Sequence, residues 1–449
     1  MRPFLRAAAL TAVLLPAPLL AQTTSNQTNA TPATKAADSQ SQQQAKSPST
    51  LTGEWGGLRT KLRDDGIDLT AGYTSEFATN ISGGTRKDAT ETGQFSFGAT
   101  VDTDKLLGLK GGTLQTTITF RRGHDLDLRA GLGTLQQVQE VYGRGQTWRL
   151  TEFWYQQQFA GGVDLKLGRL VQGGDFNSFS CNFENLSFCG AQAGNLFGDY
   201  WYNYPVAQWG ARLRLKRRDW YVMVGAYENN PNNLLNNFTL SHRGATSVLV
   251  PVEAGWTPHL GPHHLPGSYR IGGWYNSSNG DDVLLDVNHH PIAITGAEPL
   301  VHSGRYGGYI LLQQQLTGTY VDDPKTGPKT THGLSVFLNF TQGDRATSTT
   351  DNQLAAGLFF TGPIPGRKDD DLGFAVARTD LNSRVAEADL LAAPGSARPR
   401  AEYESELYYS VHLRPWLIVR PNVQYVIDPG GYANVTDVVV FGIKSAVTF

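Results

Sequence analysis

From Asp68 to the end of the chain, apolar and polar residues alternate with a period of two in one segment after another. The last segment is an example, because Phe441 and Ile443 flank the small residue Gly442. A period of two places successive side chains on opposite faces of a β-strand, so each segment predicts a strand with one apolar and one polar face. The segments are Leu69–Tyr73, Phe95–Val101, Leu114–Arg121, Glu152–Phe159, Val163–Leu167, Trp209–Lys216, Trp220–Tyr227, Val248–Trp256, Tyr269–Tyr275, Arg305–Leu316, Leu334–Phe340, Leu354–Phe360, Leu372–Thr379, Glu402–Leu413, Trp416–Val426 and Val438–Phe449.

The last predicted strand ends on Phe449, so the chain stops at a strand edge that must be either free or paired. The free edge of such a strand promotes aggregation in a soluble protein, whereas a closed membrane barrel has no free edge. Some turns are short, as at Leu413–Pro415, and others are long and polar, as at Gly173–Pro205 and Gly280–Ser303. This asymmetry is typical of barrels with short turns on one side of the membrane, and strands of usual length would number roughly 14 to 18. We therefore predict an all-β fold, a transmembrane antiparallel β-barrel of about 16 strands.

The N-terminal part differs in composition from the predicted barrel. Arg2 and Arg6 precede the apolar run Ala7–Leu20, so we expect residues 1–21 to be a secretory signal peptide. Residues 22–50 are almost all Gln, Ser, Thr, Ala, Asn and Lys, which predicts a disordered polar leader.

Residues 51–66 predict a short amphipathic helix, because Trp55, Leu58 and Leu62 are spaced three and four apart. This helix could dock on the body of the protein, or it could act as a plug or lid at a pore mouth. No domain boundary follows it, so residues 51–449 are expected to form one barrel domain.

Composition excludes some classes of protein. After the signal peptide no apolar stretch is long enough for a membrane helix, although a mean hydropathy of −0.32 would also suit a soluble protein. The 50 Gly, 18 Tyr and 20 Phe are suited to tight turns and to aromatic girdles at the membrane surfaces. Charged residues make up only 17% with a net charge of −2, so nothing indicates a nucleic-acid partner.

The segment Gly173–Tyr204 is the longest insertion between predicted strands, and it contains both cysteines. In an exported protein, Cys181 and Cys189 are expected to form a disulfide, with metal binding as the alternative. The loop itself could fold inward and set the size of a pore, or it could form an outward cap.

Several motifs resemble a known family. They are L-T-G-E-W-G-G-L-R-T-K-L-R-D-D-G-I at Leu51–Ile67, L-K-L-G-R-L at Leu165–Leu170, P-W-L-I-V-R-P-N-V-Q-Y-V-I-D-P-G-G at Pro415–Gly431 and F-G-I-K-S-A-V-T-F at Phe441–Phe449. Together they resemble the carbohydrate-selective porins of the OprB type. The resemblance implies a sixteen-stranded barrel in the Gram-negative outer membrane that passes glucose and related sugars by diffusion. The leader Gln22–Ser49 and the cysteine-bearing segment Phe179–Gly190 are not part of the motifs that carry the resemblance.

A sugar channel needs polar groups for the hydroxyls and aromatic faces for the C–H surface of the sugar. The polar faces of the predicted strands carry both kinds of residue, although any one of them could be an ordinary hydrated residue of the lumen. Glu404 and Glu406 could pair with Arg420 across neighbouring strands. The candidate substrate-binding residues are Arg121, Glu152, Trp154, Arg212, Arg214, Glu404, Glu406, Arg420, Gln424 and Lys444.

The mixed signs of these residues favour neutral solutes over ions. Lys444 is expected beside the strand of Arg420 and, once the barrel closes, near the first strand after Asp68. We expect small neutral sugars and outer-membrane lipid as partners, no cofactor, no metal site and no enzyme activity; the sequence fits either a monomer or a homo-oligomer. A soluble exported carbohydrate-binding β-protein is the alternative function. A transporter driven by an energy-coupling protein would need a large N-terminal plug domain, and only Leu51–Gly66 precedes the first strand.

Overall fold

A computed structural model describes residues 49–235, 238–323 and 327–449. The predicted signal peptide and the predicted leader up to residue 48 lie outside the described residues.

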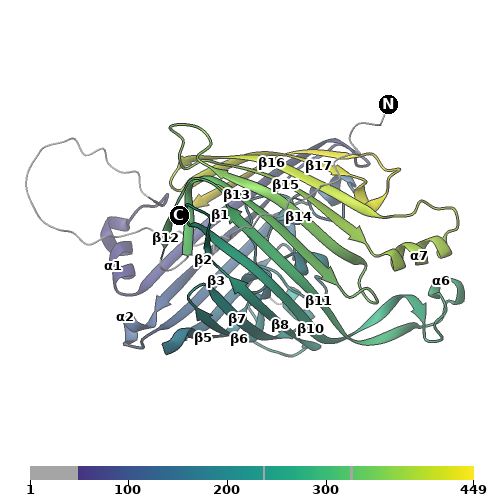
Figure 1. Ribbon diagram of the computed structural model, residues 1–449, viewed down its shortest axis with the longest axis horizontal. Coiled ribbons are helices and arrows are strands. Elements are labelled where there is room, and N and C mark those ends of the chain that lie inside the picture. The colour runs from purple at the N-terminus through teal and green to yellow at the C-terminus, as the bar shows by residue number, and fades with distance from the viewer. Residues whose placement is uncertain (1–48, 236–237, 324–326) are drawn as a thin grey trace, which may run out of the picture.

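Sixteen of the described strands form one closed antiparallel barrel, in which each strand pairs with the next and β18 pairs with β1 (Figure 1). Each predicted segment overlaps one of these strands, so the predicted fold class and strand number are confirmed. The strands are β1 Ile67–Ser82, β2 Ala89–Asp102, β3 Gly112–Gly123, β4 Trp148–Phe159, β5 Val163–Leu170, β6 Gln208–Arg217, β7 Trp220–Asn229, β8 Ser247–Trp256, β10 Leu265–Asp286, β11 Pro299–Gln315, β13 Gly327–Gly343, β14 Thr350–Thr361, β15 Asp371–Leu381, β16 Ala401–Arg414, β17 Leu417–Ile427 and β18 Val438–Thr448. Two short strands, β9 His259–Leu260 and β12 Thr319–Asp323, extend hairpins at one end of the barrel.

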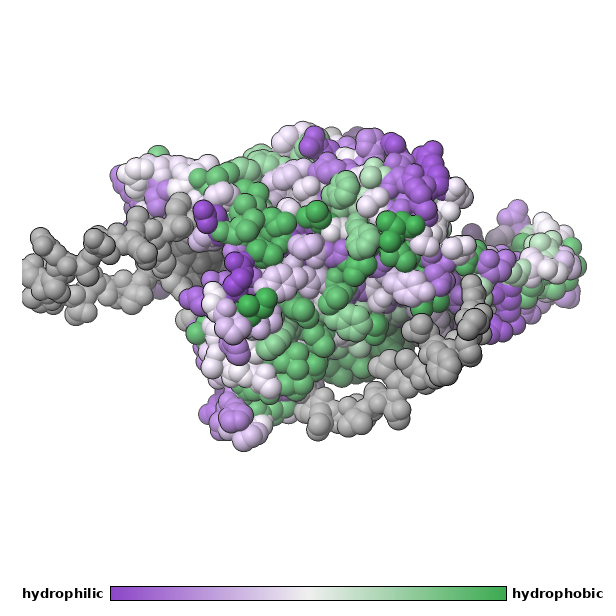
Figure 2. Space-filling view, turned by 90° about the horizontal axis from the view of Figure 1, so that it is seen from above, coloured by the Kyte–Doolittle hydropathy of each residue, from purple (hydrophilic) through white to green (hydrophobic). Residues whose placement is uncertain are grey.

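The two faces of each strand meet different surroundings. On β7, Trp220, Val222 and Val224 are exposed on the outer wall, while Met223 and Tyr227 are buried inside. Figure 2 shows hydrophobic side chains gathered over the middle of the outer wall on the face seen from above. An apolar outer band with a polar interior is the arrangement that a lipid bilayer requires of a barrel.

The two ends of the barrel differ as the turn lengths predict (Figure 1). The C-terminus, α1 (Leu58–Asp64) and α2 (Thr103–Leu107) lie at the end with short turns. The helices α6 (Ile292–Thr295) and α7 (Ser383–Ala392) lie at the other end. Short turns face the periplasm in outer-membrane barrels, so we call the first end periplasmic and the second extracellular.

The extracellular end departs from expectation in two ways. Half of the predicted polar loop Gly280–Ser303 is strand, because β10 continues to Asp286 and pairs with β11, as in Gly280↔His302. The buried face of this extension carries Asp282, Leu284 and Asp286, so polar residues interrupt the apolar alternation that marks a strand. The helix α7 was also not expected; its N-cap Asn382 accepts a hydrogen bond from the Arg384 N–H.

A 3-10 turn at Trp55–Gly57 and the helix α1 lie within the predicted range 51–66. The predicted apolar face is not docked, however, because Trp55 and Leu58 are exposed, and α1 does not line the lumen cavity. The buried residue is Arg59, whose guanidinium donates to the Phe449 carbonyl at 2.8 Å and to the Leu69 carbonyl at 2.9 Å. A polar anchor to the barrel seam therefore holds this segment in place of hydrophobic docking. None of the helices described is long and apolar enough to cross a membrane.

Candidate functional site: the lumen

Two long loops fold into the barrel from its extracellular end. The first loop, residues 124–147, joins β3 to β4, and the second loop, residues 171–207, joins β5 to β6. Phe176, Phe183 and Trp201 of the second loop have no exposed surface. Of the two alternatives for the long loop, the structure therefore shows the inward one.

Aromatic packing holds the second loop against one half of the barrel wall. One cluster joins Phe176, Phe197, Tyr200 and Trp201 of the loop to inward residues of β7, β8, β10 and β11. A second cluster joins Phe179, Phe183 and Phe188 to inward residues of β13–β16. Buried aromatic rings contribute large apolar areas, so this half of the lumen is filled with packed side chains. The wall residues of the two clusters are Met223, Tyr227, Leu249, Trp274, Tyr309 and Leu311, and Phe337, Ala355, Ala375, Ala377 and Tyr408.

The open part of the lumen is a cavity of about 2130 Å³. Inward residues of β1–β4, β17 and β18 line most of its wall, and the two infolded loops line the rest. Some residues of β12–β16 and of the periplasmic turns line it as well. The pore cavity is thus off-centre, beside the seam between β18 and β1.

The structure divides the ten predicted substrate-binding residues into two groups. Those that line the pore cavity are Arg121, Glu152, Trp154, Arg420 and Lys444. Those that do not line it are Arg212, Arg214, Glu404, Glu406 and Gln424. In the second group, Arg212 and Arg214 form ion pairs with Asp164, and the other three lie beneath the infolded loops with almost no exposed surface.

Lys444 connects its own strand, β18, to β1 and to both infolded loops. It lies on β18, directly opposite Arg420 of β17 and Glu76 of β1, as closure of the barrel predicts. Its ammonium group is 3.0 Å from a Glu76 carboxylate oxygen and 2.9 Å from a carboxylate oxygen of Glu140 in the first loop. It also donates to the Phe183 carbonyl of the second loop at 2.8 Å.

The predicted pairing of glutamates with Arg420 is corrected by the structure. Within the described residues, no ion pair joins Glu404 or Glu406 to Arg420 or Lys444. Glu406 instead accepts the backbone N–H groups of Glu184 at 2.9 Å and Asn185 at 2.7 Å. The second loop covers the inner face of β16 and β17 and offers backbone amides, and a buried carboxylate must be satisfied by the nearest donors.

Arg420 also binds the second loop, whereas Glu404 binds the neighbouring strand β15. Glu404 accepts the Thr379 hydroxyl at 2.6 Å, and Arg420 donates to the Asn182 carbonyl at 2.5 Å. Glu402 likewise accepts the backbone N–H of Leu135 in the first loop at 2.8 Å. Charged residues of the late strands thus hold the infolded loops in place.

A chain of hydrogen bonds, the polar track, runs across β2, β3 and β4 on the open side of the lumen. Thr100 donates to Gln115 at 2.5 Å, Gln115 donates to Thr117 at 2.9 Å, and Thr117 donates to Glu152 at 2.8 Å. The Trp154 indole N–H donates to the other Glu152 oxygen at 3.2 Å, and the Lys166 ammonium lies 4.3 Å from the centre of the indole ring. The polar track gives the pore cavity hydroxyl, amide, carboxylate and aromatic groups within one surface.

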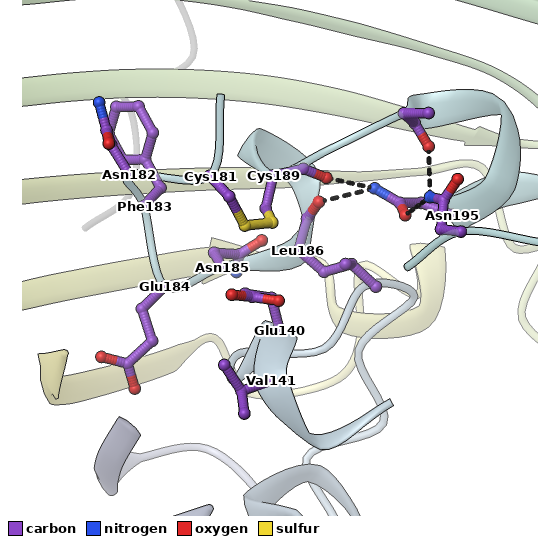
Figure 3. The surroundings of a disulfide bond; sticks show 12 residues. Glu140, Val141, Cys181, Asn182, Phe183, Glu184, Asn185, Leu186, Cys189 and Asn195 are labelled. Atoms are coloured by element: carbon purple, nitrogen blue, oxygen red, sulfur yellow. Dashed lines mark hydrogen bonds between the residues drawn. A yellow bond between two sulfur atoms is a disulfide. The ribbon is translucent and has the colours of Figure 1, made fainter. Parts of the chain in front are cut away.

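A disulfide joins Cys181 to Cys189 in the second loop and closes residues 181–189 into a ring, the disulfide ring (Figure 3). The Asn195 side chain donates to the Leu186 carbonyl at 3.0 Å and to the Cys189 carbonyl at 2.9 Å. Cys181, Asn182 and Cys189 line the pore cavity. The carboxylate of Glu140 lies beside the two sulfurs, but sulfurs bonded to each other are not the thiolates that bind metal.

The sequence interpretation missed three residues of this site: Glu76, Glu140 and Glu184. Glu76 lies on the inward face of β1, so the alternation of that strand could have indicated it. Glu140 and Glu184 lie in loops, where no periodicity indicates the direction of a side chain. The whole first loop was missed for the same reason.

A closed barrel with a polar lumen narrowed by infolded loops is the architecture of a porin. The family model described as carbohydrate-selective porin, OprB family, matches residues 86–449, and the chain belongs to this family. The protein is a transport channel of the Gram-negative outer membrane that passes sugars. The exposed apolar outer wall also disfavours the soluble alternative.

Named relatives agree with this assignment. Porin B of Pseudomonas aeruginosa is 42% identical over 89% of this chain and 91% of its own length. The putative porin QuiX of Acinetobacter baylyi is 33% identical over 89% of this chain and 93% of its own length. A solved structure described as the high pH structure of Pseudomonas putida OprB superposes with a TM-score of 0.84 at 41% identity, over 90% of this chain and 99% of that chain.

The buried carboxyl of Glu184 makes the stability of the packed loops depend on pH. Burial, together with Glu76 and Glu406 nearby, raises the pKa of Glu184 well above its ordinary value of 4.5, while Lys444 and the Asn422 amide act in the opposite direction. The folded protein favours the protonated form. The stability that this carboxyl contributes is therefore fully present below the unfolded pKa and is lost as pH rises through the higher folded pKa.

We predict that Glu184→Gln weakens this pH dependence. Glutamine keeps a neutral acceptor for the Asn422 amide, which donates to Glu184 at 2.6 Å. Between about pH 5 and about pH 9, the urea midpoint of the variant should fall less than that of the original protein. The exposed Glu387 of α7 supplies the control Glu387→Gln. Equal declines in all three proteins would contradict the prediction.

Proposed function

We propose that this porin passes glucose and similar small neutral sugars by passive diffusion, through the space between the polar track and the disulfide ring. The polar track is the observation that carries the proposal, because it offers donors, acceptors and an aromatic ring along one wall of the pore cavity. Sugars need that combination, since their hydroxyls are polar and their C–H faces are apolar.

The charges of the lumen support a neutral substrate. Lys444 is balanced by Glu76 and Glu140, and the Arg121 guanidinium lies 3.9 Å from Glu140. A channel for anions would present unbalanced rings of arginine or lysine. Charges that are already paired fix the shape of the lumen and give a neutral solute hydrogen-bonding partners. This role requires no cofactor and no catalysed reaction.

Arg121 connects β3 to β2 and to the first loop. It donates to Gln94 of β2 at 2.8 Å and to the Gly143 carbonyl of the first loop at 2.7 Å. We assign Arg121, Glu152 and Trp154 to substrate contact, and Arg420 and Lys444 to both substrate contact and loop positioning. We assign Arg212, Arg214, Glu404, Glu406 and Gln424 to support of the wall and loops in place of substrate contact.

Three further proposals complete this picture. Residues 1–21 would direct export, and residues 22–50 would form a polar leader, as their composition predicts. The outer wall would contact the lipid of the outer membrane. A homo-oligomer stays a prediction.

We predict that the purified protein opens discrete channels in planar bilayers. Liposomes that contain it should swell faster in glucose than in an amino acid of equal size, because the hydroxyls and the C–H face of the sugar match the hydrogen-bonding groups and the indole ring of the polar track. Glu152→Gln should lower this preference, and Glu387→Gln should leave it unchanged. Swelling that does not distinguish the two solutes would contradict the proposed selectivity, and an absence of channels would contradict the proposed mode of transport.

We also predict that the disulfide ring limits the width of the pore. Cys181→Ser combined with Cys189→Ser should raise single-channel conductance and admit larger sugars, because the ring backbone is the acceptor for Arg420 and Lys444 and would lose its fixed shape. Dithiothreitol should have the same effect on the original protein and none on the double variant. If reduction changes neither conductance nor size limit, the ring does not narrow the pore.

A further inference from the structure

The pore cavity is larger than one sugar at the polar track requires. Pockets that hold a single small organic ligand usually measure about 300–1,000 Å³, whereas the pore cavity measures about 2130 Å³. β14 and β3 are nearly opposite each other in the closed strand order, so the wall of β13–β15 faces the polar track across the lumen. This facing wall contributes its own residues to the lining of the pore cavity.

Four inward residues of the facing wall form a continuous surface, the exit patch: Ser335 of β13, Phe359 and Thr361 of β14, and Asp371 of β15. Ser335 lies directly opposite Phe359, and Thr361 lies directly opposite Asp371. Phe359 and Thr361 are two residues apart on one strand, so both project from the same face. The exit patch is at the periplasmic end of the barrel, because Thr361 ends β14 and Asp371 begins β15.

Phe359 gives the exit patch an aromatic surface. Its ring stacks on Phe337 with centroids 5.3 Å apart, and it lies 5.6 Å from the Phe183 ring of the second loop. Phe359 packs against the aromatic cluster that holds the second loop, but it is only partly buried and lines the pore cavity. The C–H face of a sugar can therefore pack on a ring whose orientation is fixed by its neighbours.

Asp371 supplies a carboxylate that the wall does not fully use. The preceding residue, Asp370, accepts the Tyr409 hydroxyl at 2.7 Å and the His412 backbone N–H at 2.9 Å. Asp371 instead lies beside the Tyr408 hydroxyl, and within the described residues its Oδ2 atom accepts no hydrogen bond. A carboxylate can accept several hydrogen bonds, and the hydroxyls of a sugar are donors. Asp371 can therefore bind a sugar without giving up a contact that holds the fold.

We propose that the exit patch is a second sugar-binding subsite, which takes a neutral monosaccharide in its pyranose form. The sugar packs its C–H face on Phe359 and donates hydroxyl groups to Asp371, while the hydroxyls of Ser335 and Thr361 lie beside the edge of its ring. The polar track combines an aromatic ring with a carboxylate in the same way. This inference rests on the proposed function, and it adds that the lumen holds two sugars at once, on opposite walls.

Block of single-channel current by glucose tests this subsite on the intact porin. The block should have two components, one for each wall. Asp371→Asn should weaken one component by about tenfold, because the sugar exchanges a charged acceptor for a neutral one. Phe359→Leu should weaken the same component, because leucine keeps an apolar side chain but has no flat ring. Glu152→Gln should weaken the other component and leave this one unchanged.

Two neighbouring positions supply matched controls. Asp369→Asn removes an equal charge from the same end of the pore cavity, in the exposed turn before β15. Phe360→Leu removes the next ring of β14, which projects from the opposite face of the strand. Both control variants should retain both components of the block.

The outcomes separate the subsite from the proposed function. A block with one component that Glu152→Gln weakens and Asp371→Asn leaves intact would overturn the subsite, and the proposed function would stand. If glucose does not block the current while liposomes still swell faster in glucose, the subsite alone fails; if swelling shows no preference either, both fail. Equal effects of Asp371→Asn and Asp369→Asn would assign the effect to charge alone, against the proposal. Altered open-channel conductance with both components weakened alike would assign Asp371 and Phe359 to the shape of the pore, also against it.

Discussion

The ammonium group of Lys444 fixes the position of both infolded loops relative to the barrel seam. It is within 3.0 Å of Glu76 on β1, Glu140 in the first loop and the Phe183 carbonyl in the second. Removal of one partner from a buried ion pair typically costs about 3–5 kcal/mol, because the remaining charge is left uncompensated. Closure of the barrel brings Lys444 opposite Glu76, so the register of the seam decides where the loops attach and how wide the pore is.

The lumen is divided between packing and transport. Aromatic residues of the second loop fill the half beside β7, β8, β10, β11 and β13–β16, and the half beside the seam stays open and polar. Close-packed aromatic rings make the filled half rigid. The loop can therefore present the disulfide ring to the polar track at a fixed position, which a loop held only by surface contacts could not do.

The strands and their two faces could be predicted from the sequence, but the roles of the inward residues could not. A period of two separates the lipid face from the lumen face, and each predicted segment lies on a strand. Glu152 and Glu406 show the same alternation, yet Glu152 lines the pore cavity and Glu406 binds the backbone of the second loop. The difference depends on which part of the wall a loop covers, and that is set by packing between residues far apart in the chain. The extension of β10 and β11 beyond the membrane could not be predicted, because its buried face carries Asp282 and Asp286 and so lacks the apolar alternation.

Single-channel recording of Lys444→Met tests most directly whether this residue sets the width of the pore by holding the two loops in place. We expect higher conductance, noisier current and weaker block by glucose, since both loops lose a common anchor. Adding Glu76→Gln neutralises the carboxylate that Lys444→Met leaves unpaired, and should recover stability without restoring the original conductance. Conductance and glucose block equal to those of the original protein in both variants would show that Lys444 does not set the width of the pore through the loops.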